Sequence, residues 1–325
     1  MTLNNKSVMV TGGAGFIGSH LVDRIIKEDP EKVLIVDNFF LGKHRNIQHS
    51  LNENDNVKLV YQDAAHYEKM KNLIEMEGVD VVFNLAVVPL LTSHELPKVT
   101  CEDNINIALS ILELQRNGLF KTLINCSSSE AYGTAETVPM SETHALNPET
   151  PYAASKASCD LLVDSYRRTF GMDVATVRPF NNYGPRQNEG SYAGVIPVTI
   201  QRILNGEQPI VYGTGEQTRD YIYVEDVADA FVEVYNSEST RGKTLNIATG
   251  QEITILDMVK AIASEMQYPG EIRFESVRPA DVMRHMGDIA LARKLIGFEP
   301  KTSFSNGIKK TVEWYLEVFG KTGGE

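Results

Sequence analysis

Few cysteines and no long hydrophobic run occur in this sequence, and both absences narrow its class. Its 325 residues include three cysteines that are widely spaced and form no C-x-x-C pair. They are Cys101, Cys126 and Cys159. A secreted disulfide framework is therefore not expected, and we predict a reducing cytoplasm. No signal peptide is recognised, and the longest uncharged run, between Asp80 and Glu95, is too short to span a bilayer.

Positive charge is also scarce, with 31 basic against 43 acidic residues and a net charge of −12. Nucleic acids and anionic membranes would repel such a surface, so neither is expected as a partner. An anionic ligand would need a locally positive pocket. The seven histidines show no H-E-x-x-H or comparable spacing, and we predict no metal site. The 42% hydrophobic content fits a soluble globular protein of one large domain or two coupled ones.

Short β-branched runs alternate with longer amphipathic stretches through the first half of the chain. The runs predicted as strands are 8–11, 33–37, 57–61, 79–85, 122–127 and 174–178. The stretches predicted as helices are 19–27, 67–77, 104–117 and 151–170. The strands show little polar alternation, as expected when helices cover both faces of a sheet. This pattern predicts an α/β fold with a Rossmann-type, doubly wound parallel sheet.

The regular alternation of predicted strands and helices ends after residue 178, and loop-rich segments there are mixed with further helices and strands. We predict helices over 195–204, 225–235 and 255–266 and a strand over 244–248. A smaller, partly interleaved C-terminal domain is the expected arrangement. Residues 1–178 would form the first domain, with a later strand near 222–248 returning to it. Residues 179–221 and 249–325 would form the second.

A glycine-rich turn follows the first predicted strand, with the sequence T-G-G-A-G-F-I-G over residues 11–18. Glycines permit a tight turn and let backbone N–H groups approach a pyrophosphate at the start of the next helix. Its place between a strand and a helix supports the motif, which alone is a weak signal. The residues expected to meet the dinucleotide here are Gly12, Gly15, Phe16, Ile17 and Gly18.

Asp37 ends the second predicted strand, 19 residues after Gly18. A carboxylate at this place accepts hydrogen bonds from the adenosine ribose and repels a 2′-phosphate, which indicates NAD rather than NADP. A surface aspartate that merely closes a strand is the alternative. Asp63, at the end of the third strand, is a candidate adenine contact or a plain loop residue. The remaining predicted cofactor contacts are Asn38, Ala64, Leu85 and Ala86.

Tyr152 and Lys156 stand four residues apart on a predicted helix, so they share one face. A lysine ammonium beside a phenol lowers the pKa of the phenol and makes it a usable general base. The spacing alone also fits a solvated helix face. Ser128, Ser129 and Glu130 follow the strand 122–127, at the end of the sheet where ligands bind, although serines there could be simple turn formers.

These motifs together resemble the extended short-chain dehydrogenase/reductases, and within them the NAD-dependent nucleotide-sugar epimerases and dehydratases. The matching stretches are 11–18, Asp37, 84–86, 127–133, the Y-x-x-x-K of 152–156, 181–186, 213–221 and 278–281. The resemblance implies that NAD takes a hydride from the sugar while the tyrosinate takes the hydroxyl proton. Tyr152 would be the base, Lys156 its partner, and Ser128 the hydroxyl that holds the reacting oxygen. Residues 1–178 would then bind NAD and the second domain a nucleotide diphosphate sugar.

The same resemblance extends to the substrate side and to assembly. Asn181 and Arg219 match residues that contact the substrate pyrophosphate, and Arg284 is a further candidate. Ser93, in a Ser-x-x-x-Pro element, and Ser129 would line the sugar side. Asn104 falls where the family has a structural asparagine. The helices 104–117 and 151–170 are those that family members pair into a homodimer interface.

The presence of a glutamate at position 130 helps to distinguish between the reactions that members of this family catalyse. Dehydratases need a base for the carbon 5 proton once carbon 4 is a ketone, and a carboxylate can serve. Simple 4-epimerases usually carry a small or apolar residue there. We therefore predict a nucleotide-sugar 4,6-dehydratase, with a 4-epimerase or a UDP-glucuronate decarboxylase as alternatives. A non-catalytic NAD-binding sensor is a remote alternative, because such relatives generally lose the tyrosine and lysine that this chain keeps.

Overall fold

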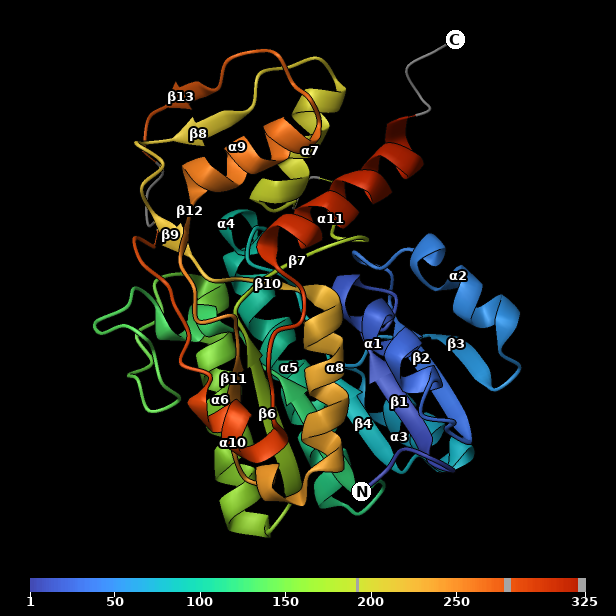
Figure 1. The fold of residues 1–325 in the computed structure, drawn as a ribbon. Coiled ribbons are helices and arrows are strands. Elements are labelled where there is room, and N and C mark those ends of the chain that lie inside the picture. Colours follow the sequence, from blue (N-terminus) through green and yellow to red (C-terminus); the bar gives the residue numbers. More distant parts are fainter. Residues whose placement is uncertain (191–192, 278–281, 321–325) are drawn as a thin grey trace.

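A seven-stranded parallel sheet occupies the larger part of the molecule (Figure 1). The computed structural model describes residues 1–190, 193–277 and 282–320. The strand order is β11-β6-β5-β4-β1-β2-β3, and it changes direction between β1 and β4. The strands of this sheet are β1 (Ser7–Thr11), β2 (Lys32–Asp37), β3 (Val57–Tyr61), β4 (Val81–Asn84), β5 (Thr122–Cys126), β6 (Asp173–Pro179) and β11 (Thr244–Ile247). Such a switch point leaves a crevice at the carboxyl ends of the strands.

Helices cover both faces of the sheet. Those around it are α1 (Phe16–Ile26), α2 (His44–Glu53), α3 (Tyr67–Glu77), α4 (Thr92–Glu95), α5 (Pro97–Arg116), α6 (Pro151–Phe170), α8 (Val224–Asn236) and α10 (Ala290–Ile296). Two 3₁₀ turns accompany them, η1 (Ser129–Tyr132) and η2 (Glu238–Thr240). α1 and α8 pack together, as do α5 and α6.

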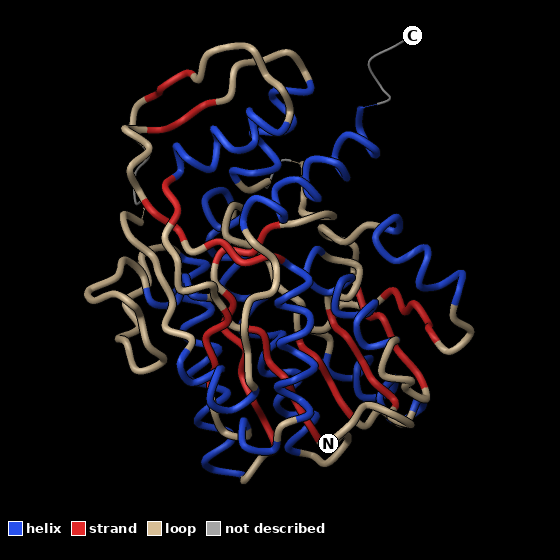
Figure 2. Tube along the Cα trace, viewed as in Figure 1, coloured by secondary structure: helices blue, strands red, loops and turns tan. Residues whose placement is uncertain are grey.

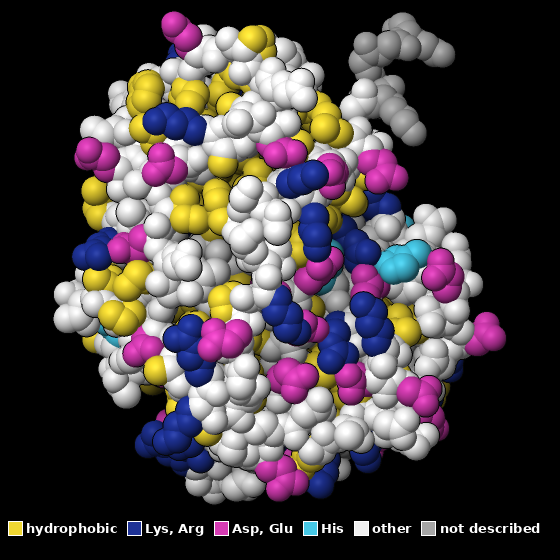
Figure 3. Space-filling model, viewed as in Figure 1, with side chains coloured by type: hydrophobic (Ala, Val, Ile, Leu, Met, Phe, Trp, Pro, Cys, Tyr) yellow, Lys and Arg dark blue, Asp and Glu magenta, His cyan; other side chains and the backbone are white. Residues whose placement is uncertain are grey.

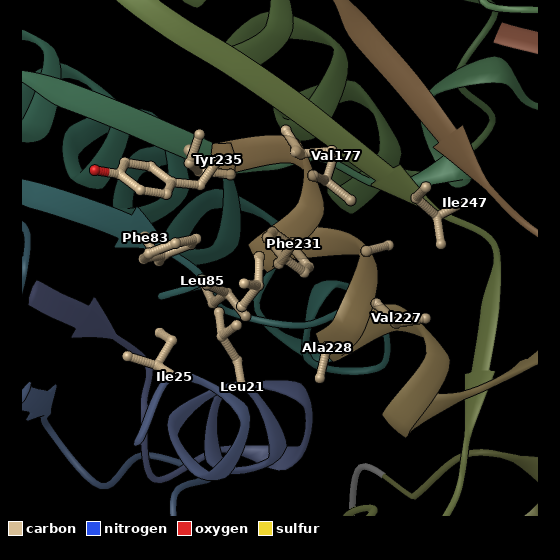
Figure 4. Close-up of a cluster of buried hydrophobic side chains, with 14 of the residues drawn as sticks. Leu21, Ile25, Phe83, Leu85, Val177, Val227, Ala228, Phe231, Tyr235 and Ile247 are labelled. Carbon is tan, nitrogen blue, oxygen red and sulfur yellow. The ribbon is translucent and has the colours of Figure 1, made fainter. Parts of the chain in front are cut away.

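Successive side chains of the central strands enter two separate cores. In β1, Val8 and Val10 join the core formed with α1 and α8, whereas Met9 joins the core formed with α3, α5 and α6. Figure 4 shows part of the first core, where Phe231 of α8 and Leu21 of α1 lie near Phe83 of β4. Since both faces are buried, the central strands carry apolar residues at adjacent positions rather than at alternate ones, as in Val8, Met9 and Val10 of β1. The predicted doubly wound fold is confirmed.

Element boundaries differ from the predictions where the sequence pattern is weak. The predicted strand 79–85 is shorter, at Val81–Asn84, and the predicted helix 104–117 begins earlier, at Pro97. Proline suits the first turn of a helix because its missing N–H has no partner there anyway. The sequence analysis missed α2, since this polar helix buries only Asn46, Ile47 and Ser50.

A smaller part of the structure adjoins the sheet at the end of β6, in the upper half of Figures 1 and 2. Its helices are α7 (Val195–Leu204), α9 (Ile255–Glu265) and α11 (Phe304–Phe319). Its strand pairs are β7 (Asn181–Tyr183) with β10 (Tyr221–Tyr223), β8 (Ile210–Tyr212) with β13 (Arg273–Glu275), and β9 (Thr218–Arg219) with β12 (Ile253–Thr254). A third core, centred on Tyr183, Ile200 and Tyr315, joins them. The division into an NAD-binding and a nucleotide-sugar-binding domain stays a prediction.

Charges of both signs are interleaved on the face in Figure 3. Arg24 of α1, for example, bonds Asp229 of α8 at 2.8 Å and Glu28 at 2.6 Å. None of the helices in the described part of the chain is long and apolar enough to cross a membrane. Within the same residues, no three His, Cys, Asp or Glu side chains are grouped so that they could hold a metal ion.

Candidate functional site

A cavity of about 330 Å³ lies at the switch point of the sheet. Residues at or just after the carboxyl ends of six neighbouring strands, β1 to β6, border it. All the cofactor contacts predicted from the sequence line this cavity: Gly12, Gly15, Phe16, Ile17, Gly18, Asp37, Asn38, Asp63, Ala64, Leu85, Ala86, Tyr152 and Lys156. Ser128 lines it as well. The fold thus brings together residues that are up to 144 positions apart, from Gly12 to Lys156.

The glycine turn at the start of α1 is shaped to receive an anion. Gly12 has a positive φ of 68°, and a side chain at Gly18 would collide with the carbonyl oxygen of Gly12. α1 begins at Phe16 with Gly15 as its N-cap, and no side chain caps it. The N–H groups of the first turn therefore point at the cavity without a side-chain acceptor, at the positive end of the helix dipole. This arrangement fits a pyrophosphate.

Asp37 lies beside this turn with its carboxylate held in place. One oxygen accepts from the backbone N–H of Ala14 at 2.9 Å, and the other accepts from that of Phe39 at 2.8 Å. Burial raises the pKa of Asp37, although these two hydrogen bonds act in the opposite direction. Gly42 packs so closely that a Cβ there would lie 2.6 Å from the carboxylate. Each oxygen keeps a lone pair for the hydroxyls of a ribose.

Tyr152 and Lys156 lie on the first turns of α6, against the end of β5. The Nζ of Lys156 donates to the carbonyl oxygen of Cys126 at 2.6 Å. Burial raises the pKa of Tyr152 above its ordinary value, and the charge of Lys156 and a hydrogen bond with Ser128 offset this only in part. The sequence analysis expected the lysine to lower that pKa towards neutrality. Lys156 does act in that direction, but removal of the phenol from water outweighs it, so the pKa of Tyr152 stays above its ordinary value.

Asn104 fixes the segment after β4 against α6. Its Oδ1 accepts from the N–H of Val88 at 2.7 Å, and its Nδ2 donates to the carbonyl of Val88 at 3.1 Å. The same Nδ2 donates to the Oγ of Ser155 at 2.9 Å. The asparagine therefore connects the wall formed by Leu85 and Ala86 to the helix that carries Tyr152.

Glu130 follows the serines in η1 and does not line the cavity. Its backbone N–H donates to the Oγ of Ser128 at 3.3 Å. Its carboxylate is near enough to Tyr152 for its charge to raise the pKa of the phenol, though less than burial does. Ser129 is buried at 3% exposure and does not border the cavity either.

Two predicted substrate contacts use their polar atoms within the protein and lie outside the cavity: Ser93, predicted on the sugar side, and Asn181, predicted at the pyrophosphate. The Oγ of Ser93 donates to the carbonyl of Leu90 at 2.6 Å. The Nδ2 of Asn181 lies 3.5 Å from the Nδ1 of His285, whose Nε2 lies 3.2 Å from the carbonyl oxygen of Ser129. Burial lowers the pKa of His285 to about 4, so the ring is neutral at pH 7. Its Nε2–H donates to the carbonyl, and its Nδ1 accepts from the amide.

The predicted substrate arginines also lie outside the cavity. Arg219 donates from Nη1 to the carbonyl oxygens of Thr218, at 2.9 Å, and Val282. Arg284 forms a two-pronged contact with Glu252, at 2.8 Å from Nε and 2.7 Å from Nη2. The predicted element 278–281 lies outside the described residues. The roles of Ser93, Asn181, Arg219 and Arg284 stay predictions.

Several polar residues that the sequence analysis did not single out also line the cavity. They are Lys43, Asn46, Gln62, Asn182, Arg186, Gln187 and Asn188. Most of them follow stretches that it did recognise, either Asp37 or the motif 181–186. Their proximity in sequence to Asp37 or to the motif 181–186 was the signal that could have identified them. Nothing in the sequence, however, showed that the segment after Asp37 and the segment after residue 181 meet in the fold.

Comparisons with known proteins agree on one family. The family model described as GDP-mannose 4,6 dehydratase matches residues 9–311. UDP-glucose 4-epimerase of Mycolicibacterium smegmatis is 33% identical over 309 residues, 94% of this chain and 97% of that protein. Other relatives include a decarboxylase and a 4,6-dehydratase of nucleotide sugars.

Solved structures of such enzymes share the whole fold. A UDP-glucose 4-epimerase from Thermotoga maritima, solved with UDP-glucose, superposes with a TM-score of 0.90 at 32% identity, covering 96% of this chain and 99% of that one. A dTDP-glucose 4,6-dehydratase from Streptomyces venezuelae, solved with NAD bound, gives a TM-score of 0.90 at 27% identity, covering 97% and 98%.

Proposed function

Since the chain belongs to the GDP-mannose 4,6-dehydratase family of extended short-chain dehydrogenase/reductases, we propose that it is a nucleotide-sugar 4,6-dehydratase. Its cofactor is NAD, and the glycine turn, the uncapped start of α1 and the carboxylate of Asp37 fit that dinucleotide. The observation that carries the specific reaction is Glu130, a carboxylate within electrostatic reach of Tyr152. The substrate class is a nucleotide diphosphate sugar.

In this proposal Tyr152 and Glu130 transfer protons, and Ser128 and Lys156 support Tyr152. NAD supplies the hydride acceptor that makes carbon 4 of the sugar a ketone. Tyr152 takes the proton of the carbon 4 hydroxyl, and Ser128, its hydrogen-bond partner, holds the reacting oxygen. Lys156 stabilises the phenolate with its charge while Nζ stays anchored on the carbonyl of Cys126.

Glu130 then removes the proton from carbon 5, which the neighbouring ketone has made acidic. The hydroxyl of carbon 6 takes up that proton from Glu130 and leaves as water, so Glu130 is a carboxylate again and a double bond joins carbons 5 and 6. Carbon 6 would then receive the hydride of the reduced cofactor while carbon 5 takes up a proton, so the net change is the loss of one molecule of water. The η1 turn holds the backbone N–H of Glu130 against the Oγ of Ser128, and this short separation along the chain supports a role for the carboxylate in the same reaction.

The test is a Glu130→Gln variant. We expect water loss to fall by about 10²- to 10⁴-fold, the usual contribution of a general base. Oxidation of the sugar should persist, seen as absorbance of reduced nicotinamide that builds up on adding substrate. Glu136→Gln, an exposed carboxylate in the following loop, is the control and should keep full turnover. Full turnover of Glu130→Gln would rule out the dehydratase proposal.

A 4-epimerase is the second candidate, because relatives and solved neighbours of that name match nearly the whole chain. In that case Glu130 serves the turn rather than the chemistry. Mass spectrometry of products from UDP, GDP, dTDP and CDP sugars separates the reactions. Loss of water supports dehydration, an unchanged mass supports epimerisation, and loss of carbon dioxide supports a decarboxylase.

We also propose a cytoplasmic homodimer. Hydrophobic side chains are exposed on α5 and α6, among them Val99 at 42%, Leu161 at 65% and Phe170 at 50%. These two helices pack against each other. The three cysteines are free thiols, which fits a reducing compartment.

A further inference from the structure

A short segment after β7 crosses the cofactor cavity and has no role in the proposed reaction. We call residues 185–190 the strap. Arg186, Gln187 and Asn188 of the strap line the cavity together with the glycine turn. The loop after β2 lines it too, through residues 38 and 40–43. The strap and this loop are far apart in sequence, yet they border the same cavity.

One end of the strap is fixed to α1. The Nε2 of His20 lies 3.0 Å from the carbonyl oxygen of Pro185. Burial lowers the pKa of His20 to about 4, so the neutral ring donates this hydrogen bond at pH 7. Arg186 forms an ion pair with Asp23 at 2.8 Å and adopts a positive φ of 65°, a conformation that costs a non-glycine residue free energy. The contacts with α1 hold it there.

The middle of the strap is fixed to α11. The hydroxyl of Tyr315, which is fully buried, donates to the carbonyl oxygen of Gln187 at 2.6 Å. The Nε2 of Gln187 donates to the carbonyl of Asn182 at 3.3 Å. The strap is therefore held from behind, by a helix that does not border the cavity.

At its other end, Glu189 reaches across to the loop and α2. Its carboxylate accepts from Lys43 Nζ at 2.7 Å and from the guanidinium of Arg45. The side chain of Glu189 is only 9% exposed, so these ion pairs are screened less than exposed ones. Arg45 also lies over the rings of Trp314 and Phe319, at 5.8 and 5.2 Å from their centroids. One carboxylate thus joins the strap, α2 and, through Arg45, α11.

We propose that Glu189, with Lys43 and Arg45, forms a clasp that closes the strap over the dinucleotide and slows its release. Glu189 is a positioning residue in this scheme, since it does not itself line the cavity. NAD leaves only after the ion pairs with Lys43 and Arg45 break and the strap lifts from the loop. An enzyme that oxidises its sugar with NAD and later returns the hydride gains from a cofactor that stays bound through the cycle.

The experiment measures NAD release from the holoenzyme. The wild type is loaded with labelled NAD, mixed with a large excess of unlabelled NAD, and the bound label is followed over time. In Glu189→Gln we expect release about tenfold faster, the factor for losing one charge-assisted hydrogen bond. Wild-type release should also quicken as salt is raised, whereas release from Glu189→Gln should respond much less.

Glu77→Gln is the matched control. Glu77 is likewise a nearly buried carboxylate, 13% exposed, and it contacts two cations, Lys32 at 2.6 Å and Lys58 at 3.4 Å. It lies at the opposite end of the sheet strands, away from the cavity, because Lys32 begins β2 while Asp37 ends it. Its loss should leave NAD release at the wild-type rate. Glu189→Asp, which keeps the charge on a shorter side chain, should restore part of the retention.

Three results would overturn the clasp. The first is NAD release from Glu189→Gln at the wild-type rate. The second is slower release from Glu189→Gln, which would mean that the freed Lys43 binds the cofactor phosphates. The third is that Glu77→Gln accelerates release as much as Glu189→Gln does. The proposal depends on NAD binding but on neither dehydration nor epimerisation. Failure of the wild type to bind NAD would refute the cofactor assignment instead, so the two failures are distinguishable.

Discussion

A buried ion pair near the serines that follow β5 leads to a quantitative prediction. Nη2 of Arg178 in β6 lies 2.5 Å from Oδ2 of Asp160 in α6, and the two side chains are 4% and 7% exposed. The same carboxylate oxygen accepts from Ser127 Oγ at 2.6 Å, and the guanidinium lies 4.4 Å from the ring centroid of Tyr132. Asp160 is one helical turn after Lys156, so the pair joins α6 to β6 under the site, and the hydrogen bond from Ser127 extends it to the segment after β5.

Removing one partner leaves the other charge buried without compensation. This costs about 3–5 kcal/mol, a large part of the roughly 5–15 kcal/mol that stabilises a typical protein. We expect that loss in Arg178→Met and in Asp160→Leu, the two single variants of the cycle, and also in Asp160→Asn. The double variant Asp160→Leu with Arg178→Met removes both charges and should lie within about 1–2 kcal/mol of the wild type, since Ser127 and Tyr132 each lose one contact.

Urea denaturation followed by circular dichroism supplies the free energies of unfolding for this cycle. Arg116→Met is the control, because Arg116 pairs with Glu113 at the surface, where the side chains are 36% and 31% exposed. An exposed pair contributes about 0–1 kcal/mol. The reasoning fails if Asp160→Asn costs no more than this control, or if the double variant loses the sum of the two single losses.

Two further predictions concern the cofactor and pH. Replacing Asp37 by Ala removes the carboxylate that the N–H groups of Ala14 and Phe39 hold in place. The affinity for NAD should then fall about 10- to 100-fold, and the preference for NAD over NADP should become smaller. Fluorescence titrations with both dinucleotides measure this, and an unchanged preference would contradict the prediction. Burial lowers the pKa of His20 and His285 from 6.5 to about 4, so the unfolded chain takes up protons below pH 6.5 that the native one refuses. The free energy of unfolding should therefore fall by about 3 kcal/mol per histidine as pH drops from 6.5 to 4. The variant His285→Gln should lose less stability over this pH range, by the contribution of one histidine. An unchanged pH dependence of stability in that variant would show that the buried histidine is not the cause.

The sequence predicted the sheet and its cofactor edge because both depend on local patterns. The glycine turn, Asp37 and the Tyr152–Lys156 spacing each lie within one strand–helix unit. Parallel strands bring their carboxyl ends to one edge, so the common location of these motifs follows from the fold class. The helices 67–77 and 151–170 also match α3 and α6 in extent, since each has an amphipathic pattern and clear ends.

The partners of charged residues could not be predicted in the same way. Arg284 contacts Glu252 where β9 pairs with β12, the strand after Glu252, and where the N–H of Thr218 in β9 donates to the carbonyl of Met283. Nothing local to either charged residue indicates these pairings. Lys43 and Glu189 are 146 positions apart and meet only because the strap crosses the cavity. Side-chain partners of this kind depend on how loops lie across the finished fold, and a single sequence carries no periodic signal for that.

The acidic composition raised the question of how this protein could bind a dianionic dinucleotide. Three cations of the described chain line the cavity, and each is already engaged: Lys43 with Glu189, Arg186 with Asp23, and Lys156 with a backbone carbonyl. Side-chain charge therefore adds little attraction for a pyrophosphate. The N–H groups of Gly12, Ala14 and Gly15 in the glycine turn are already bonded within the protein. The donors left for the pyrophosphate are the backbone N–H groups of the first turn of α1, which attract an anion through their dipoles. The net negative charge of the whole surface repels a long polyanion, because such a partner contacts many surface charges at once. It has little effect on a small ligand whose phosphates lie directly against one helix terminus, since salt screens charges that are more than about one Debye length away.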